Sequence, residues 1–241
     1  MPEIYKVDGL IFECESAIET WRVETLLVKE EGTIRWLGGC RPGDVLYDVG
    51  ANIGIYSLYA ARRGATVYAF EPHVGNAAAL LRNAAANADL TARINVVTTP
   101  LHSVCGLGTF YYAALDNGSS GHQFEATTER AVATELRWAT TVDAFVAAGT
   151  PPPTLVKIDV DGNELEVLKG MSLLLRNTAP REIQVEVQKA TQQPISEFLL
   201  DLGFTFVERH DTENGKKLLL AGALPEDVAH NEVFERRGAI A

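Results

Sequence analysis

The sequence predicts an α/β fold with a mostly parallel sheet and helices on both faces. Short apolar runs alternate with helical stretches from Val45 onward, a pattern typical of parallel strands joined by crossover helices. The first run ends in the turn Gly50-Ala-Asn-Ile-Gly54, and an amphipathic segment follows it, which predicts strand, tight turn and helix. With 241 residues, 46% of them hydrophobic, the chain is long enough for one such domain with additions.

The N-terminal part, residues 1–42, is expected to be an extension packed on the core. Two short apolar runs flank an Asp-Gly turn and predict a small hairpin over residues 4–12. The charged segment that follows predicts a helix near residues 16–22 or 23–30. Two glycine-containing turns over residues 38–43 separate this extension from the first core strand.

The core domain is expected over residues 43–222. Its further strands are predicted at residues 66–70, 94–97, 155–158, 183–187, 204–207 and 217–220. Its further helices are predicted at residues 76–87, 141–148, 164–175 and 195–202. An Asn214-Gly215 turn is expected to join the last two strands as a hairpin, so the seventh strand should be antiparallel.

Two further segments complete the expected organisation. Residues 114–140 are predicted to form an inserted loop, because residues 116–137 are polar, rich in Gly and Ser and weakly periodic. A loop this long in a compact domain is usually functional or mobile. Residues 108–113 alternate like an exposed strand, and the charged tail, residues 223–241, is expected to add one more helix.

Composition makes several classes of partner less favourable. The net charge of -11, from 32 acids against 21 bases, disfavours non-specific binding to nucleic acid or to an anionic membrane surface. It leaves room for a local basic patch, but no Lys/Arg cluster is visible. No apolar run approaches the roughly 20 residues that span a bilayer, and no secretory signal precedes Ile4. Three widely spaced cysteines, Cys14, Cys40 and Cys105, fit reduced thiols better than disulfides. The expected location is the cytoplasm.

The first turn and the second strand end predict a nucleoside site. Glu71 follows Asp48 by 23 residues and ends the second predicted strand, where an acid can accept hydrogen bonds from both ribose hydroxyls; the alternative is a solvated strand-end acid. The turn is one residue shorter between its outer glycines than G-x-G-x-x-G and carries Asn52 within it. This favours a ligand without pyrophosphate over NAD, and the absence of Gly-Lys-Ser/Thr excludes a P-loop.

A later strand end carries charge on one face. Lys157, Asp159 and Asp161 are spaced i, i+2, i+4, so on an extended strand they share a face. Unpaired buried charges are costly, so these residues are expected either beside a ligand or in a purely structural Lys–Asp network. Glu186, which ends the next apolar strand, is expected to face the same crevice, with an exposed acid as the alternative.

Three motifs in order resemble the FkbM-type methyltransferases, which are class I enzymes that use S-adenosylmethionine. They are Asp48-Val-Gly-Ala-Asn-Ile-Gly54, Phe70-Glu71-Pro72, and Val156-Lys-Ile-Asp-Val-Asp-Gly162 followed by Glu164. Asp161 stands where the family usually has glutamate, which keeps the charge and shortens the reach. The resemblance implies a Rossmann-like class I methyltransferase fold, with S-adenosyl-L-methionine as the cofactor. The expected cofactor-binding residues are Asp48, Gly50, Asn52, Gly54, Glu71, Pro72, Ser103 and Asp159.

Several of these roles have alternatives. Asp48 is expected to orient the turn or reach the cofactor's amino group, and otherwise caps the following helix. Asn52 either positions the turn or touches the ligand. Ser103 lies where such folds contact the adenine, although small loop residues are usually only turns. His122, in the Gly/Ser-rich loop, is a candidate general base or a solvated loop histidine.

The expected reaction is in-line methyl transfer to an oxygen of a small or medium-sized acceptor, such as a sugar or secondary-metabolite hydroxyl. Asp159 and His122 are the candidate bases, with Lys157 and Asp161 shaping the acceptor pocket beside Glu186. No metal is expected; an ion at Asp159 and Glu186 would lack a third ligand. The rivals are an NAD-type oxidoreductase and a non-catalytic methyltransferase-like assembly protein. The expected partner is a small-molecule acceptor, without nucleic acid or membrane, and a homodimer is left open.

Overall fold

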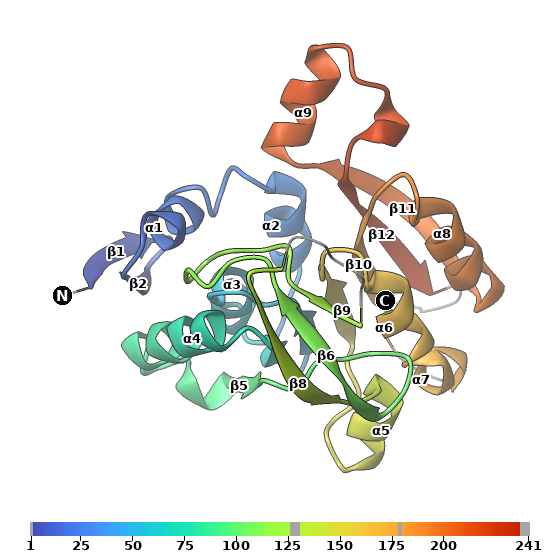
Figure 1. The fold of residues 1–241 in the computed structure, drawn as a ribbon, viewed down its shortest axis with the longest axis horizontal. Helices are drawn as coiled ribbons and strands as arrows, with labels where there is room; N and C mark the ends of the chain where they lie inside the picture. Colours follow the sequence, from blue (N-terminus) through green and yellow to red (C-terminus); the bar gives the residue numbers. More distant parts are fainter. Residues whose placement is uncertain (1, 126–130, 178–179, 237–241) are drawn as a thin grey trace.

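A seven-stranded sheet forms the centre of the computed structural model, which describes residues 2–125, 131–177 and 180–236 (Figure 1). The strand order is β11-β12-β10-β9-β3-β4-β5. The strands are β3 (Val45–Val49), β4 (Thr66–Phe70), β5 (Ile94–Val97), β9 (Leu155–Ile158), β10 (Glu182–Val187), β11 (Phe204–Asp211) and β12 (His230–Arg236). The strands from β10 to β5 pair in parallel, whereas β12 is antiparallel to both of its neighbours. The predicted mostly parallel sheet with an antiparallel last strand is therefore confirmed.

The segment that supplies this last strand differs from the prediction. Residues 217–220 belong to the helix α9 (Glu213–Leu220), not to a strand, and Asn214-Gly215 lies inside its first turn instead of forming a hairpin turn. Thr212 caps this helix, since its hydroxyl accepts a hydrogen bond from Gly215 N, and such a cap satisfies a donor that the helix leaves unpaired. The turn propensity of the Asn-Gly pair predicts a hairpin here, whereas the Thr212 cap before it begins a helix.

The tail, expected to be a helix, instead completes the sheet. Within the described part of the tail, residues 223–236, Pro225–Asp227 forms a single 3-10 turn, η2, and His230–Arg236 then forms β12 between β10 and β11. Residues 237–241 of the predicted helix lie outside the described residues. The first five residues of β12 are buried. A strand covered on both faces shows no alternation of polar and apolar residues, so the period that would identify it is missing from the sequence.

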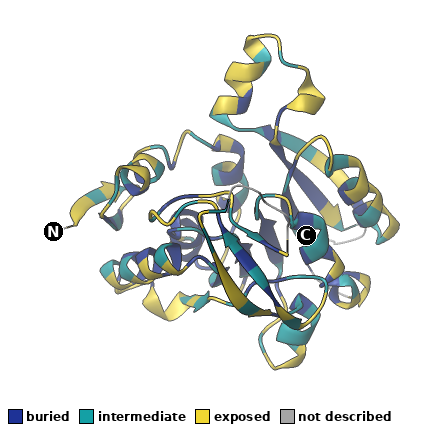
Figure 2. Cartoon of the chain, in the orientation of Figure 1, coloured by how far each residue is buried: buried dark blue, intermediate teal, exposed yellow. Residues whose placement is uncertain are grey.

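Helices cover both faces of the sheet, and the central strands are the most buried part of the fold (Figure 2). Helices α2 (Glu31–Leu37), α3 (Ile55–Arg62) and α4 (Val74–Ala86) pack on one face. The opposite face carries α5 (Val142–Ala147), α6 (Glu164–Lys169), α7 (Ser172–Asn177) and α8 (Gln192–Asp201). The single helix predicted over residues 164–175 is divided at Gly170, where an added Cβ would lie 2.1 Å from the His102 carbonyl oxygen.

The N-terminal residues form the expected hairpin, β1 (Glu3–Val7) and β2 (Leu10–Cys14), followed by α1 (Ala17–Glu24). The hairpin is fixed to α4 by two asparagine side chains: Asn83 accepts from Glu13 N and Asn87 accepts from Ile11 N, both at 2.9 Å. A capping box at Ser16 begins α1, which confirms the helix predicted near residues 16–22. The alternative over residues 23–30 is wrong, because residues 25–30 form turns and α2 begins only at Glu31.

The segment predicted as an inserted loop contains strands of a second sheet. This sheet has the order β7-β6-β8, with β6 (Gly106–Tyr112), β7 (Gln123–Phe124) and β8 (Ala133–Ala139). Residues 126–130 of the segment lie outside the described residues. A short 3-10 turn, η1 (Thr91–Arg93), precedes β5. In the three described stretches, no helix is both long enough and apolar enough to cross a membrane.

Candidate active site

A pocket lies at the carboxyl ends of β3, β4 and β9, where the direction of strand order reverses. From β3 the chain proceeds outward to β4 and β5 and then returns to β9 on the other side of β3. Open α/β sheets bind their ligands at such a reversal. The pocket is lined by the residues after these strands, including Gly50, Glu71 and Asp159.

The turn after β3 forms one wall of the pocket and requires a glycine. Gly50 has φ +84°, and an added Cβ would lie 1.8 Å from the Asp159 carbonyl oxygen. The amides of Gly50 and Ala51 both donate to the Phe70 carbonyl, at 2.9 and 3.0 Å. Asn52 also has a positive φ, +52°, which asparagine tolerates better than most residues. The backbone therefore approaches β9 and β4 closely, and the turn is held rigidly.

Glu71 joins the ends of β3 and β4. Its Oε2 accepts from Asn52 N at 2.7 Å and its Oε1 accepts from His73 N at 2.8 Å. Burial raises the pKa of Glu71 to about 7, although these two backbone hydrogen bonds oppose the shift. Each carboxylate oxygen keeps a further lone pair, and the side chain lines the pocket.

A buried ion pair supports the acid at the end of β9. Lys157 Nζ lies 3.1 Å from Asp159 Oδ2 and 4.0 Å from Asp48 Oδ1, and only 1% of the lysine side chain is exposed. Burial raises the pKa of Asp159, but the Lys157 ammonium, together with the charges of Lys29 and Arg22, outweighs burial and holds that pKa below its usual value. Asp159 is therefore ionised at neutral pH, and it faces the pocket.

The Asp159 charge raises the pKa values of two further acids, Asp161 and Glu186. Burial and then the Asp159 carboxylate raise the pKa of Asp161 to about 6. The Asp159 carboxylate and then burial raise the pKa of Glu186 well above its usual range. Acids whose environments separate their pKa values can carry different protonation states at one pH, so here an ionised Asp159 is adjacent to a protonated Glu186.

Residues 117–124, which we call the strap, run across the pocket. The Ser119 carbonyl accepts from Asn52 Nδ2 at 2.8 Å and from Asn76 Nδ2 at 3.1 Å. At the other side, Gly121 N donates to Asp161 Oδ2 at 2.6 Å. The strap thus connects the turn after β3 to the strand end of β9, and it contributes Ser119, Ser120, His122 and Phe124 to the pocket lining.

His122 is held within the strap. Its Nδ1 accepts from Ala113 N at 3.2 Å, its Nε2 lies 3.1 Å from Ser119 Oγ, and its ring stacks on His73 at 4.3 Å between centroids. Burial and the nearby His73 lower the pKa of His122 to about 4. The imidazole is therefore neutral at pH 7 and lines the pocket, instead of lying in solvent.

The structure brings together many of the residues expected from the sequence. The pocket lining contains Gly50, Asn52, Glu71, Pro72, His122, Asp159 and Asp161. The lining does not contain Asp48, Gly54, Ser103, Lys157 or Glu186. Asp48 is buried and accepts from Ser57 of α3 at 2.6 Å, and Gly54 is the residue before α3.

Other residues that line the pocket belong to no motif or spacing in the sequence that would have identified them. On the side of β5 the lining is Thr99, Pro100 and Leu101, two to four residues before Ser103. From the N-terminal extension, Arg22 and Lys29 reach the pocket. The described part of the chain holds no group of three or more His, Cys, Asp or Glu side chains arranged to bind a metal ion.

Comparison with known proteins identifies relatives over most of the chain. Residues 48–206 match the Methyltransferase FkbM domain. The hexuronic acid methyltransferase AglP of Haloferax volcanii is 31% identical over 187 residues, which cover 73% of this chain and 71% of AglP.

Solved structures with the same architecture are more distant in sequence. Methyltransferase FkbM from Methylobacillus flagellatus matches with a TM-score of 0.56 and 15% identity, over 79% of this chain and 43% of that chain. Magnesium protoporphyrin IX methyltransferase (ChlM) from Synechocystis, solved with bound SAM, matches with a TM-score of 0.52 and 13% identity, over 92% of this chain and 84% of that chain. At these identities the likeness shows a shared fold.

Proposed function

The chain belongs to the FkbM methyltransferase family, and from this premise we propose that it transfers the methyl group of S-adenosylmethionine to an oxygen atom of a sugar. It has the α/β fold of the class I methyltransferases. The observation that carries the proposal is that Glu71 and Asp159, at the ends of two parallel strands, line one pocket together with the turn at Gly50.

The residues of this pocket fit the proposed cofactor. Each carboxylate oxygen of Glu71 accepts one backbone N–H and can accept a ribose hydroxyl as well. Gly50 has no side chain to obstruct a ligand lying along the turn, and Thr99–Leu101 offer a separate wall for the adenine. Asp159 and Asp161 provide negative potential that suits the cationic donor.

The reaction then depends mainly on alignment. S-adenosylmethionine, when bound, supplies a methyl group that its sulfonium charge already activates. The chain must hold the acceptor oxygen in line and exclude water, which in favourable cases lowers a barrier by about 7–11 kcal/mol. The strap closes over the pocket between Asn52 and Asp161, and ionised Asp159 can accept the proton of an acceptor hydroxyl.

The acceptor class is the finer part of the proposal. AglP is a hexuronic acid methyltransferase, and we extend that class to this chain: the acceptor is a sugar or sugar derivative, and hexuronic acids are the first to test. Calorimetry with S-adenosylhomocysteine, followed by a labelled-methyl screen over uronic and neutral sugars, phenols and peptides, tests both parts. Tight NAD binding without a response to S-adenosylhomocysteine overturns the proposal, and cofactor binding without transfer to any acceptor supports the assembly-protein alternative.

A further inference from the structure

Two basic side chains lie in a pocket whose other charged lining residues are acids. Arg22 belongs to α1, and Lys29 lies in the turn between α1 and α2. The acids of the lining are Glu71, Asp159 and Asp161. In a chain with a net charge of -11, a pair of cations directed into the pocket favours an anionic ligand group there.

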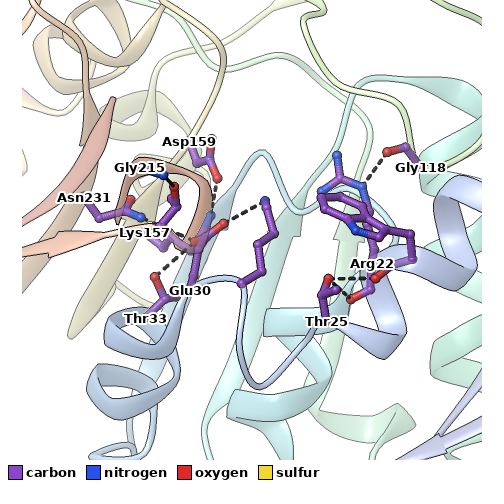
Figure 3. Close-up of polar contacts among 12 residues, drawn as sticks. Arg22, Thr25, Glu30, Thr33, Gly118, Lys157, Asp159, Gly215 and Asn231 are labelled. Carbon is purple, nitrogen blue, oxygen red and sulfur yellow. Dashed lines mark hydrogen bonds and ion pairs between the residues drawn. The ribbon is translucent and has the colours of Figure 1, made fainter. Parts of the chain in front are cut away.

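Arg22 is positioned by one hydrogen bond and retains most of its donors. Its Nε donates to the Gly118 carbonyl of the strap (Figure 3). Its two Nη groups make no hydrogen bond or ion pair with any described residue. A guanidinium has five N–H donors in a planar fork that matches a carboxylate. The fixed Nε therefore leaves both Nη groups available to a ligand.

Lys29 is held from three directions. Its Nζ lies 2.9 Å from Glu30 Oε1 and 5.8 Å from the centroid of the Trp21 ring, and its carbonyl accepts from Glu213 N at 2.8 Å. Glu30 is buried and also accepts from Thr33 Oγ1 at 3.2 Å. An ammonium has three donors, so Lys29 can contact a further oxygen without leaving Glu30.

We propose that Arg22 and Lys29 form a subsite that binds a carboxylate of a ligand in the pocket. This inference rests on the proposed function, which offers two sources of that group: the amino-acid end of S-adenosylmethionine and the carboxylate of an acidic sugar acceptor. In both cases the chemistry is a charge-assisted hydrogen bond to a half-buried arginine, stronger than a bond between neutral groups.

The test compares neutral variants with matched controls in the full chain. The variants are Arg22→Gln, Lys29→Gln and the double variant; the controls are Arg35→Gln and Lys189→Gln, whose side chains are 66% and 64% exposed and do not line the pocket. Arg22→Lys keeps the charge but removes the Nε donor to Gly118. It therefore distinguishes ligand binding from support of the strap.

Two pairs of probes locate the carboxylate. S-adenosylhomocysteine and 5′-methylthioadenosine differ by the amino-acid end, and glucuronic acid and glucose differ by the sugar carboxylate. Calorimetry on the free chain measures the first pair, and calorimetry with saturating S-adenosylhomocysteine measures the second. The double variant is expected to lose about 10- to 100-fold in affinity for the carboxylate member of one pair and little for its partner, with Arg22→Lys between wild type and Arg22→Gln.

The pattern of losses decides the outcome. Loss confined to S-adenosylhomocysteine assigns the subsite to the donor, and loss confined to glucuronic acid assigns it to the acceptor. The subsite is overturned if the double variant loses affinity equally for both members of each pair, or loses none. In that case, binding of S-adenosylhomocysteine by the wild-type chain still supports the proposed function. A wild-type chain that binds no S-adenosylhomocysteine overturns the proposed function itself.

Discussion

The Lys157 ammonium lies 3.1 Å from Asp159 Oδ2, so the acid that faces the pocket is paired with a fully buried cation. Asp48, on the neighbouring strand β3, lies 4.0 Å from the same ammonium. The charge of the pocket and the stability of the sheet centre therefore depend on one lysine side chain.

Replacing Lys157 by methionine should destabilise the fold strongly. The change leaves Asp48 and Asp159 without their cation, and breaking a buried pair in this way typically lowers the free energy of unfolding by about 3–5 kcal/mol. Urea denaturation measures this. Lys169→Met removes an exposed pair with Glu166 and serves as the control, with an expected effect of about 0–1 kcal/mol. Equal effects of the two changes would contradict a supporting role for Lys157.

Asp159→Asn should lower turnover more than cofactor affinity. The substitution keeps the shape but removes the charge that can accept a proton, and general-base contributions are typically about 10²- to 10⁴-fold. Steady-state kinetics with an identified acceptor and calorimetry with S-adenosylhomocysteine separate the two effects. Asp201→Asn, at the exposed end of α8, is the matched control. A fully active Asp159→Asn enzyme would remove the proposed catalytic role.

Binding of S-adenosylhomocysteine should strengthen as the pH rises through about 7, where Glu71 loses its proton. The carboxylate is the better acceptor for two ribose hydroxyls. Calorimetry at a series of pH values should show this dependence in wild type and in Glu197→Gln, an exposed control. Glu71→Gln should bind weakly at every pH. An unchanged affinity in Glu71→Gln would be evidence against the ribose assignment.

The raised pKa of Glu71 also predicts how the stability of the ligand-free chain depends on pH. Because the folded-state pKa of Glu71 is raised to about 7, its contribution to the free energy of unfolding is fully present below its ordinary pKa of 4.5. That contribution is lost as the pH rises through 7. Urea midpoints compared between wild type and Glu71→Gln should converge at low pH and separate between these two values. Parallel curves would show that Glu71 does not titrate there.

Gly50→Ala should lower the free energy of unfolding by more than the strain of its positive φ alone explains. Gly203 has nearly the same φ, +85° against +84°, but an added Cβ there meets nothing within 4 Å. Gly203→Ala therefore isolates the backbone strain, about 1–2 kcal/mol. Gly50→Ala adds the collision with the Asp159 carbonyl, so its loss of unfolding free energy should be clearly larger. Equal losses would show that the turn can move away from β9.

Much of the fold followed from local patterns, and its exceptions have physical causes. The parallel strands β3, β4, β5, β9 and β10 are apolar runs ended by turn residues, which identifies them directly. The strand predicted over residues 217–220 is wrong because the Thr212 cap, not the Asn-Gly pair, sets the local structure. The helix predicted in the tail is wrong over residues 230–236, because β12 is covered on both faces and has no alternating pattern that would identify it as a strand.

The sequence predicts those residues of the site that lie at the carboxyl ends of strands. Glu71 and Asp159 follow apolar runs in parallel strands, so sheet topology alone brings them together. Arg22 reaches the pocket because α1 docks on α4, through contacts such as Arg82–Glu19 at 3.1 Å. Lys29 is held there in part by the distant Glu213, whose amide donates to the Lys29 carbonyl at 2.8 Å. The spacing of residues within the N-terminal extension does not predict these contacts, because they depend on residues more than 60 positions away in the sequence.

The position of β12 has a consequence for synthesis of the chain. β11 is made first, yet it joins the sheet through β12, which lies between it and β10. Until residue 236 has emerged from the ribosome, β10 presents an unpaired edge and β11 has no place in the sheet. Such an edge readily pairs with another chain. Between translation of β10 and of β12, a nascent chain of this topology is therefore exposed to aggregation through this edge, and a chaperone that covers the edge would protect it.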